Sequence, residues 1–228
     1  MSECGVKRCT FTDQVKGGGA IPAHSLHFLC GEKNEVVPLV MRYHYSKMVP
    51  SNIQFVGTLH LSGGLFGDRG EAVAAAVFSI PPTRWSEDVL ELSRLVRVPE
   101  YKPPLTFLIS MCCKKLKSHG WDLIVSFADN TQGHEGIVYR ASNWNYHGKR
   151  ERRMDGLIIN GVFVPGRTCN SLYGTRSPSK LKKIKPHLLI QPHYDEGKFL
   201  YWKPLGRIGE KKAGRLGLCK NNYPKQGM

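Results

Sequence analysis

Several features that mark other protein classes are missing from this 228-residue sequence. No apolar run approaches the roughly 20 residues of a membrane-spanning helix, and the N-terminus MSECGVKRC lacks the apolar stretch of a signal peptide. There is no C-x-x-C pair, so a structural zinc site is not expected. The seven cysteines are odd in number and irregularly spaced, which favours reduced thiols over a disulfide framework. We therefore expect a soluble intracellular protein without a membrane segment.

Acidic residues are scarce in the last part of the chain. Residues 140–228 hold 19 Lys/Arg against 5 Asp/Glu, whereas residues 1–139 hold 14 against 13. The basic runs interleave with tyrosines and a tryptophan, as a surface that neutralises phosphates and stacks bases requires. The alternative is a basic face that is merely solvated. We interpret the asymmetry as nucleic-acid contact, with these candidate residues: Lys149, Arg150, Arg152, Arg153, Lys180, Lys182, Lys183 and Lys185.

Periodicity predicts an α+β fold. We expect a helix that ends near Tyr45, and then strands at 53–61, 71–80 and 88–99, with a glycine-rich loop at 62–70. After these we expect a helix at 105–117, a buried strand of parallel type at 121–129, a helix at 133–148, and strands at 156–167 and 197–205. The 41% of hydrophobic residues suffice for one core. We assign residues 1–165 to a catalytic core and residues 166–228 to a basic extension packed on it.

This order resembles the GNAT acyltransferase fold, a mixed central sheet flanked by helices. Three separated motifs are similar to a more specific group, the Mom DNA-modification proteins of Mu-like phages: HYS at 44–46, ELSRLVR at 91–97 and ADNTQGHEGIVYRASNW at 128–144. The resemblance spans roughly residues 35–150.

The resemblance to the Mom family implies an enzyme that converts the exocyclic amine of adenine in DNA to a carbamoylmethyl (acetamido) form. This modification shields phage DNA from host restriction, which implies double-stranded DNA as substrate and the cytoplasm of the bacterial host as location. The family is also linked to an acyl-CoA donor such as acetyl-CoA and to bound iron. A homodimer would suit a DNA-binding enzyme.

One loop departs from the acyltransferase pattern. GNAT enzymes hold the CoA pyrophosphate with backbone N–H groups of a glycine-rich loop. Here the loop is RVPEYKPPL, which has no glycine and contains three prolines that lack an N–H group. Either Arg94, Arg97 and Lys102 bind the phosphates with their side chains, or the donor is different, for example an aminoacyl-tRNA.

The remaining candidates come from the motifs that carry the resemblance. Asp129 follows an apolar strand, where it can act on an amine, bind a metal or cap the next helix. His44 and Tyr45 are candidates for a base, a proton donor or, with Asp129, a metal site.

Two further groups come from the central strand and the segment after the apolar strand. Ser93 is a candidate for positioning the donor. Tyr139 resembles the general acid of acyltransferases, and Asn143, four residues later, is expected to contact the donor on the same helix face. Trp144 and Tyr146 are candidates for stacking on or wedging between bases.

Two other functions stay open at this stage. One is a non-catalytic nucleic-acid-binding protein on a degenerate acyltransferase fold, which the proline-rich loop favours. The other is an ordinary acetyltransferase of small molecules or proteins, which the same loop and the charge disfavour.

Overall fold

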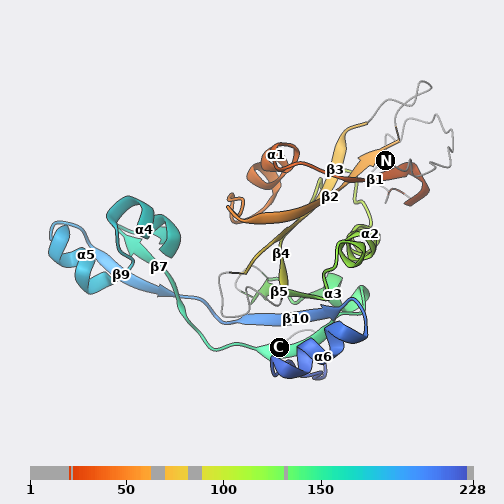
Figure 1. Cartoon of the computed structure of the whole chain (residues 1–228). Helices are drawn as coiled ribbons and strands as arrows, with labels where there is room; N and C mark the ends of the chain where they lie inside the picture. The colour runs from red at the N-terminus through yellow and green to blue at the C-terminus, as the bar shows by residue number, and fades with distance from the viewer. Residues whose placement is uncertain (1–20, 22, 63–69, 82–88, 131–132, 225–228) are drawn as a thin grey trace. The chain divides into compact units, whose positions relative to one another are not determined.

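The computed structural model describes residues 21, 23–62, 70–81, 89–130 and 133–224 (Figure 1). The chain divides into two compact units. We call the first the core unit, made of Met1–Phe127, Gly136–His147 and Tyr201–Tyr223. We call the second the inserted unit, made of Ala128–Glu135, Gly148–Leu200 and Pro224–Met228. No helix in the described part of the chain is long and apolar enough to cross a membrane.

A seven-stranded mixed sheet has the order β1-β2-β3-β4-β5-β10-β6. Its strands are β1 (Leu26–Cys30), β2 (Ile53–Leu61), β3 (Ala72–Ser79), β4 (Leu90–Arg97), β5 (Leu123–Asp129), β6 (Asn145–Lys149) and β10 (Lys198–Pro204). Strands β1 to β4 form antiparallel pairs, and β5 pairs with β4 in parallel, as predicted for 121–129. The predicted glycine-rich loop falls mostly on residues 63–69, outside the described residues.

Helices α1 (Lys33–Tyr43) and α2 (Leu105–Ser118) cover opposite faces of this sheet (Figure 1). Val56 belongs to the apolar cluster beneath α1, while a Cβ on the next residue, Gly57, would lie 2.3 Å from the Sγ atom of Cys112 on α2. Successive strand residues point to opposite faces, so the two contacts place the two helices on two sides. The predicted α+β class, a mixed sheet flanked by helices, is confirmed.

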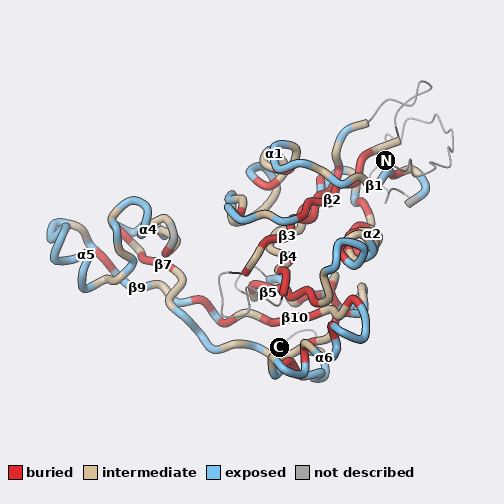
Figure 2. The backbone as a smooth tube through the Cα atoms, viewed as in Figure 1, coloured by how far each residue is buried: buried red, intermediate tan, exposed pale blue. Residues whose placement is uncertain are grey.

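The core is centred on β3. Residues 73–78 are all fully buried, and Figure 2 shows further buried residues along the neighbouring strands. Because helices cover both faces, this strand has a continuous apolar sequence, AVAAAVFS, instead of an alternating one.

The predicted helix over 133–148 is wrong. The helix α3 (Ile137–Ala141) has only five residues, and the chain continues as β6. Asn143 has a positive φ of 56°, which ends the helical path, and the aromatic residues that follow favour a strand. Tyr146 forms a β-bridge with Asn221.

The C-terminal segment 201–223 returns to the core unit. Helix α6 (Arg207–Arg215) lies in a basic segment for which no secondary structure was predicted. Lys212 pairs with Asp122 at 3.3 Å, and the indole N–H of Trp202 donates to the carbonyl of Cys219 at 2.8 Å. The basic segment is therefore folded into the core unit as well as the inserted one.

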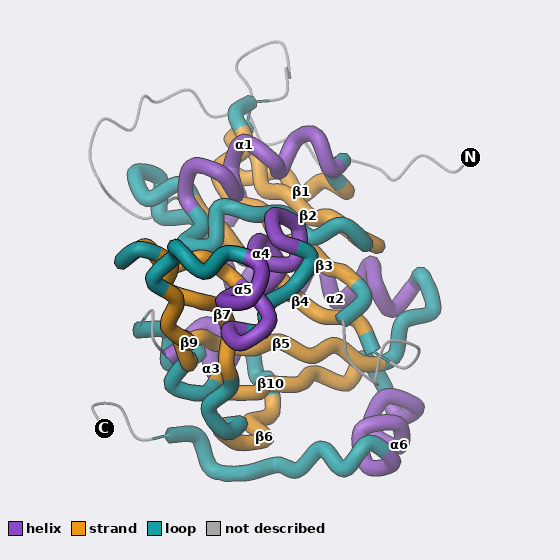
Figure 3. Tube along the Cα trace, turned by 90° about the vertical axis from the view of Figure 1, so that its left-hand side faces the viewer, coloured by secondary structure: helices purple, strands orange, loops and turns teal. Residues whose placement is uncertain are grey.

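The inserted unit contains a second sheet, of order β8-β7-β9. Its elements are β7 (Met154–Ile159), β8 (Val162–Pro165), α4 (Gly166–Tyr173), α5 (Pro178–Ile184) and β9 (Ile190–Tyr194). Asn160 and Gly161 both have positive φ, which is typical of the type I′ turn of a two-residue hairpin. Helices α4 and α5 pack on one face of this sheet around Leu157 and Leu181 (Figure 3).

The basic stretch 177–187, SPSKLKKIKPH, contains helix α5. Ser177 caps it by accepting from the backbone N–H of Lys180, and Pro178 occupies the first turn. The predicted division at 165/166 falls between β8 and α4, within the inserted unit, because β10 carries the later part of the extension back into the central sheet.

Candidate active site

The parallel strands β4 and β5 pair over a short distance only. Along these described strands the paired positions are Leu90 with Ile124 and Glu91 with Val125. At the next position the hydroxyl of Ser126 donates to the carbonyl of Leu92 at 2.8 Å. A side chain thus replaces a backbone hydrogen bond where the two strands separate.

A buried hydroxyl pair lies at this point. The Oγ atom of Ser126 is 2.7 Å from the Oη atom of Tyr139. Since a carbonyl can only accept, Ser126 uses its single proton on Leu92, and Tyr139 must then donate to Ser126. Burial raises the pKa of Tyr139 to about 12, so its hydroxyl keeps its proton at physiological pH. Sequence reasoning found Tyr139 but missed Ser126, which reads as one more residue of an apolar strand.

Aromatic rings fix the position of Tyr139. Its ring lies 5.0 Å from that of Tyr201 and 5.1 Å from that of Trp144. Gly136, with φ of 79°, precedes the helix, and a Cβ there would lie 2.3 Å from the Tyr201 ring. Trp144 and Tyr146 are 0% and 9% exposed, so they are core residues and do not present a surface for stacking bases, contrary to the prediction.

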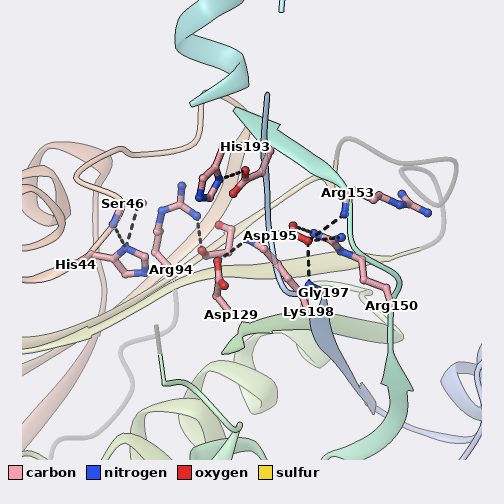
Figure 4. Close-up of polar contacts among 12 residues, drawn as sticks. His44, Ser46, Arg94, Asp129, Arg150, Arg153, His193, Asp195, Gly197 and Lys198 are labelled. Carbon is pink, nitrogen blue, oxygen red and sulfur yellow. Dashed lines mark hydrogen bonds and ion pairs between the residues drawn. The ribbon is translucent and has the colours of Figure 1, made fainter. Parts of the chain in front are cut away.

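His44 lies just after α1, as predicted, and its ring stacks on that of Tyr45 with 4.5 Å between centroids. Its Nδ1 atom accepts from the backbone N–H of Ser46 at 3.1 Å, and the Ser46 hydroxyl is 2.9 Å from the same atom (Figure 4). A backbone N–H only donates, so Nδ1 carries no proton and the neutral ring carries its proton on Nε2. In this geometry His44 offers an N–H donor at Nε2, and its role as a base or a metal ligand stays a prediction.

The β4 residues have structural partners. The hydroxyl of Ser93 donates to the carbonyl of Val77 at 3.0 Å. The Nε atom of Arg94 donates to the carbonyl of Met48 at 2.8 Å, which ties β4 to the loop that carries His44. Arg97 is exposed at the end of the strand.

Lys102 lies in the proline-rich loop before α2. It is exposed and has a φ of 43°. Pro104 precedes α2 and provides no side-chain cap for it. The first turn of α2 therefore has no glycine-rich loop in front of it.

A cleft of about 400 Å³ lies between α2, the turn after α3 and the end of β10. Lys114 and Lys117 line it from α2, and Lys203 lines it from β10. Lys203 donates to the carbonyls of Ser142 and Asn143 at 3.0 Å. Of the four residues predicted to bind the donor, the structure brings Asn143 to this cleft. The three lysines were missed because they belong to segments that sequence reasoning assigned to helix and strand surfaces.

Cys113 also lines the cleft. Burial raises the pKa of its thiol to about 11, so the thiol stays protonated and is a poor nucleophile at physiological pH. The cleft is therefore suited to binding an anionic group rather than to covalent catalysis by cysteine.

Asp129 ends β5 and belongs to the inserted unit. Its side chain is 8% exposed and pairs with the Nζ atom of Lys198 at 2.8 Å (Figure 4). The carboxylate is thus an ion-pair partner of a lysine that sequence reasoning did not single out. In the described part of the chain no group of three or more His, Cys, Asp or Glu side chains is arranged to hold a metal ion. The metal site of His44, Tyr45 and Asp129, which includes a tyrosine, stays a prediction.

Asp195 is the centre of a second polar cluster in the inserted unit. It is buried and accepts from the guanidinium of Arg150 and from the backbone N–H groups of Arg153 and Gly197 (Figure 4). Burial acts to raise the pKa of Asp195, but these hydrogen bonds outweigh burial and lower it. The guanidinium of Arg150 forms this largely buried ion pair, and its predicted contact with DNA stays a prediction.

The other predicted DNA contacts lie on the surface of the inserted unit. Lys180, Lys182, Lys183 and Lys185 are exposed on and after α5. Arg152 is exposed and pairs with Glu196 at 3.8 Å. The ammonium group of Lys149 lies over the ring of Phe199 at 5.8 Å.

Comparison with known proteins assigns the family. The Mom protein family matches residues 26–225, nearly the whole chain. This chain belongs to the Mom protein family. The match includes the motifs at 44–46, 91–97 and 128–144 and extends through the inserted unit. A comparison with curated protein sequences finds no match.

Solved structures with a similar chain path are acetyltransferases. The ribosomal-protein-S18-alanine N-acetyltransferase from Escherichia coli has 11% identity and a TM-score of 0.47, over 81% of this chain and 97% of its own. A putative acetyltransferase from Salmonella typhimurium with acetyl-CoA has 8% identity and a TM-score of 0.47, over 80% and 95%. An acetyltransferase from Staphylococcus aureus has 11% identity and a TM-score of 0.46, over 79% and 99%.

Proposed function

We propose that this Mom-family protein is a transferase that adds a carbamoylmethyl group to the exocyclic amine of adenine in DNA, and that the modification protects phage DNA from restriction. Membership of the Mom family over residues 26–225 is the observation that carries the proposal. The charge supports it, since residues 140–228 hold 19 Lys/Arg against 5 Asp/Glu and a DNA substrate is a polyanion.

The chemistry requires access to one amine and protonation of a leaving group. An adenine amine inside a duplex is reached when the base leaves the stack. Tyr139 is protonated and lies where β4 and β5 separate, and to protonate a leaving group it would give up its hydrogen bond to Ser126. The product joins the amine to a CH2 carbon, so attack on an ordinary thioester carbonyl does not give it, and the reaction needs a further step or an activated donor.

The cleft beside α2 is suited to the donor. Lys114, Lys117 and Lys203 supply positive charge, and the volume of about 400 Å³ suits part of a molecule such as acyl-CoA, whose phosphates are anionic. An aminoacyl-tRNA would bring phosphates as well.

The double variant Lys114→Gln/Lys117→Gln should weaken CoA binding measured by calorimetry. Lys115→Gln, on the same helix but outside the cleft, is the matched control. If CoA binds the wild type, the double variant and the control with equal affinity, or binds none of them, the donor is of another kind.

Nucleoside mass spectrometry tests the activity. DNA from cells that express the chain is digested to nucleosides, and the proposal expects deoxyadenosine with the added mass of one carbamoylmethyl group. Tight DNA binding with unmodified adenine would favour a non-catalytic DNA-binding protein, and that result would overturn the proposal. Protection of the same DNA from restriction enzymes gives an independent readout.

A further inference from the structure

The small sheet of the inserted unit carries an exposed aromatic pair on the face opposite its helices. Leu157 belongs to the cluster packed under α4 and α5. Ile158, which points the other way, pairs in register with Phe163 on one side and with Gln191 on the other. Directly opposed residues of antiparallel strands share a face, so Phe163 and Gln191 lie on the second face. His193, opposite Gly156, lies there too.

This pair is held in place by specific contacts. The ring centroids of Phe163 and His193 are 4.5 Å apart. A Cβ on Gly156 would lie 2.5 Å from the Phe163 ring, so glycine lets the ring lie close against β7. The Nδ1 atom of His193 is 2.7 Å from a carboxylate oxygen of Asp155, which fixes the imidazole (Figure 4).

The pair is nevertheless open to solvent. Phe163 is 44% exposed, and the side chain of His193 is 38% exposed. A ring that is almost half exposed forgoes part of the free energy of its burial, and a base stacked on it would bury that area.

The inserted unit as a whole is cationic. Residues 148–200 hold 11 Lys/Arg against 4 Asp/Glu, a net charge of +7. Three of the four acids have partners: Asp155 contacts His193, Asp195 pairs with Arg150, and Glu196 lies 3.8 Å from Arg152. The charge complements a phosphate backbone, and the flat rings complement a base.

We propose that this face, defined by Phe163, His193 and Gln191, binds an unpaired base of a DNA strand. The base stacks on the aromatic pair, as bases do on the sheet surface of single-strand-binding domains, and the amide of Gln191 hydrogen-bonds to its edge. The choice of DNA rests on the proposed function, because an adenine that leaves the stack disrupts a duplex and exposes unpaired bases. This face uses residues different from the lysines of α5.

Binding by the full chain tests the assignment. The affinity for a labelled single-stranded oligodeoxynucleotide is measured by fluorescence anisotropy over a range of salt concentrations. Phe163→Leu keeps an apolar side chain over Gly156 but removes the stacking ring, and it should weaken binding about 10-fold without changing the salt dependence. Phe163→Tyr should bind like the wild type. Val162→Ala, on the neighbouring residue that points to the helix face, is the matched control.

Photo-cross-linking locates the contact directly. A strand containing 5-iododeoxyuridine cross-links to aromatic residues on which the base stacks. After tryptic digestion the cross-link should appear on the peptide 154–167, which holds Phe163, or on the peptide that holds His193.

Several results would overturn the proposal. One is equal affinity of Phe163→Leu and the wild type for the single-stranded oligodeoxynucleotide. Another is cross-links that are confined to other peptides. A third is tighter binding of RNA than of DNA, with RNA binding weakened by Phe163→Leu to the same extent. Self-association that Phe163→Leu abolishes while DNA binding stays unchanged would assign the face to a second copy. These outcomes concern DNA binding and cross-linking only. Failure of the proposed function would show separately, as unmodified adenine in nucleosides from cells that express the wild type.

Discussion

At the scale of single residues, hydrogen bonds determine which groups can give or take a proton. The carbonyl of Leu92 forces Ser126 to donate, so Tyr139 must donate to Ser126. The backbone N–H of Ser46 likewise forces the proton of neutral His44 onto Nε2. These two assignments make Tyr139 a hydrogen-bond donor to Ser126 and leave the Nε2–H group of His44 as a donor.

The pKa of Tyr139 predicts a loss of stability at alkaline pH. Burial raises the pKa from 10.0 to about 12, so the folded protein keeps the proton while the unfolded chain releases it. This contribution to folding is complete below pH 10 and decreases as pH rises toward 12. Chemical denaturation of wild type and Tyr139→Phe over this range should show an extra loss in the wild type only. Parallel pH profiles for the two proteins would contradict the buried, protonated state.

Asp195 predicts the response of the inserted unit to acid and to mutation. Asp195→Ala leaves Arg150 without its buried partner and should destabilise the unit by about 3 kcal/mol. Because the folded pKa is lowered, the stabilisation is present above the ordinary value of 3.8 and is lost as pH falls below it. Hydrogen exchange of residues 148–200 measures both effects. Glu151→Ala, an exposed acid nearby, is the control, and equal exchange in the two variants would contradict the role of Asp195.

At the scale of elements, close contacts between helices and strands set the architecture of the core unit. Helix α2 approaches β2 so closely that residue 57 has no room for a side chain. Gly57→Ala should destabilise the protein by about 1–3 kcal/mol through overpacking against Cys112. The double variant Gly57→Ala/Cys112→Ala should regain stability in urea denaturation. Additive losses in the double variant would show that another contact is responsible.

The strands and helices of the core unit followed from sequence where the signal was local. The alternation of 53–61 and the apolar run of 121–129 predicted β2 and β5 well, and a glycine predicted the end of α2. The structure of the segment 137–149 was not predicted correctly. One positive φ at Asn143 and pairing with distant strands outweigh the helical spacing of its residues. Helix α5 was not predicted, because it lies in a lysine-rich stretch in which Leu181 is the buried apolar residue.

The candidate site was predictable only where its residues stand in local sequence motifs. Tyr139 and Asp129 stand in recognisable motifs, and sequence reasoning located both. Their partners Ser126 and Lys198 come from ordinary strands, and only the fold brings them to these residues. The role of His44 depended on a backbone N–H two residues away, which residue types alone do not reveal.

At the scale of the whole molecule, the uneven charge of the chain predicts where DNA is bound. The exposed lysines of the inserted unit on α5 should each neutralise one phosphate. The triple variant Lys180→Gln/Lys182→Gln/Lys183→Gln should lower DNA affinity and reduce the slope of log K against log salt by about 3. Lys33→Gln, an exposed lysine of α1, is the control. An unchanged slope in the triple variant would place the DNA elsewhere.

The central claim is that this Mom-family protein modifies adenine in DNA and that Tyr139 takes part in the chemistry. The most direct measurement is mass spectrometry of nucleosides from DNA of cells expressing wild type or Tyr139→Phe at equal levels. We expect carbamoylmethylated deoxyadenosine with the wild type. With Tyr139→Phe, whose DNA binding stays normal, we expect the amount of modified deoxyadenosine to fall by at least about 100-fold. Unmodified deoxyadenosine in both samples, or equal modification in both, would contradict it.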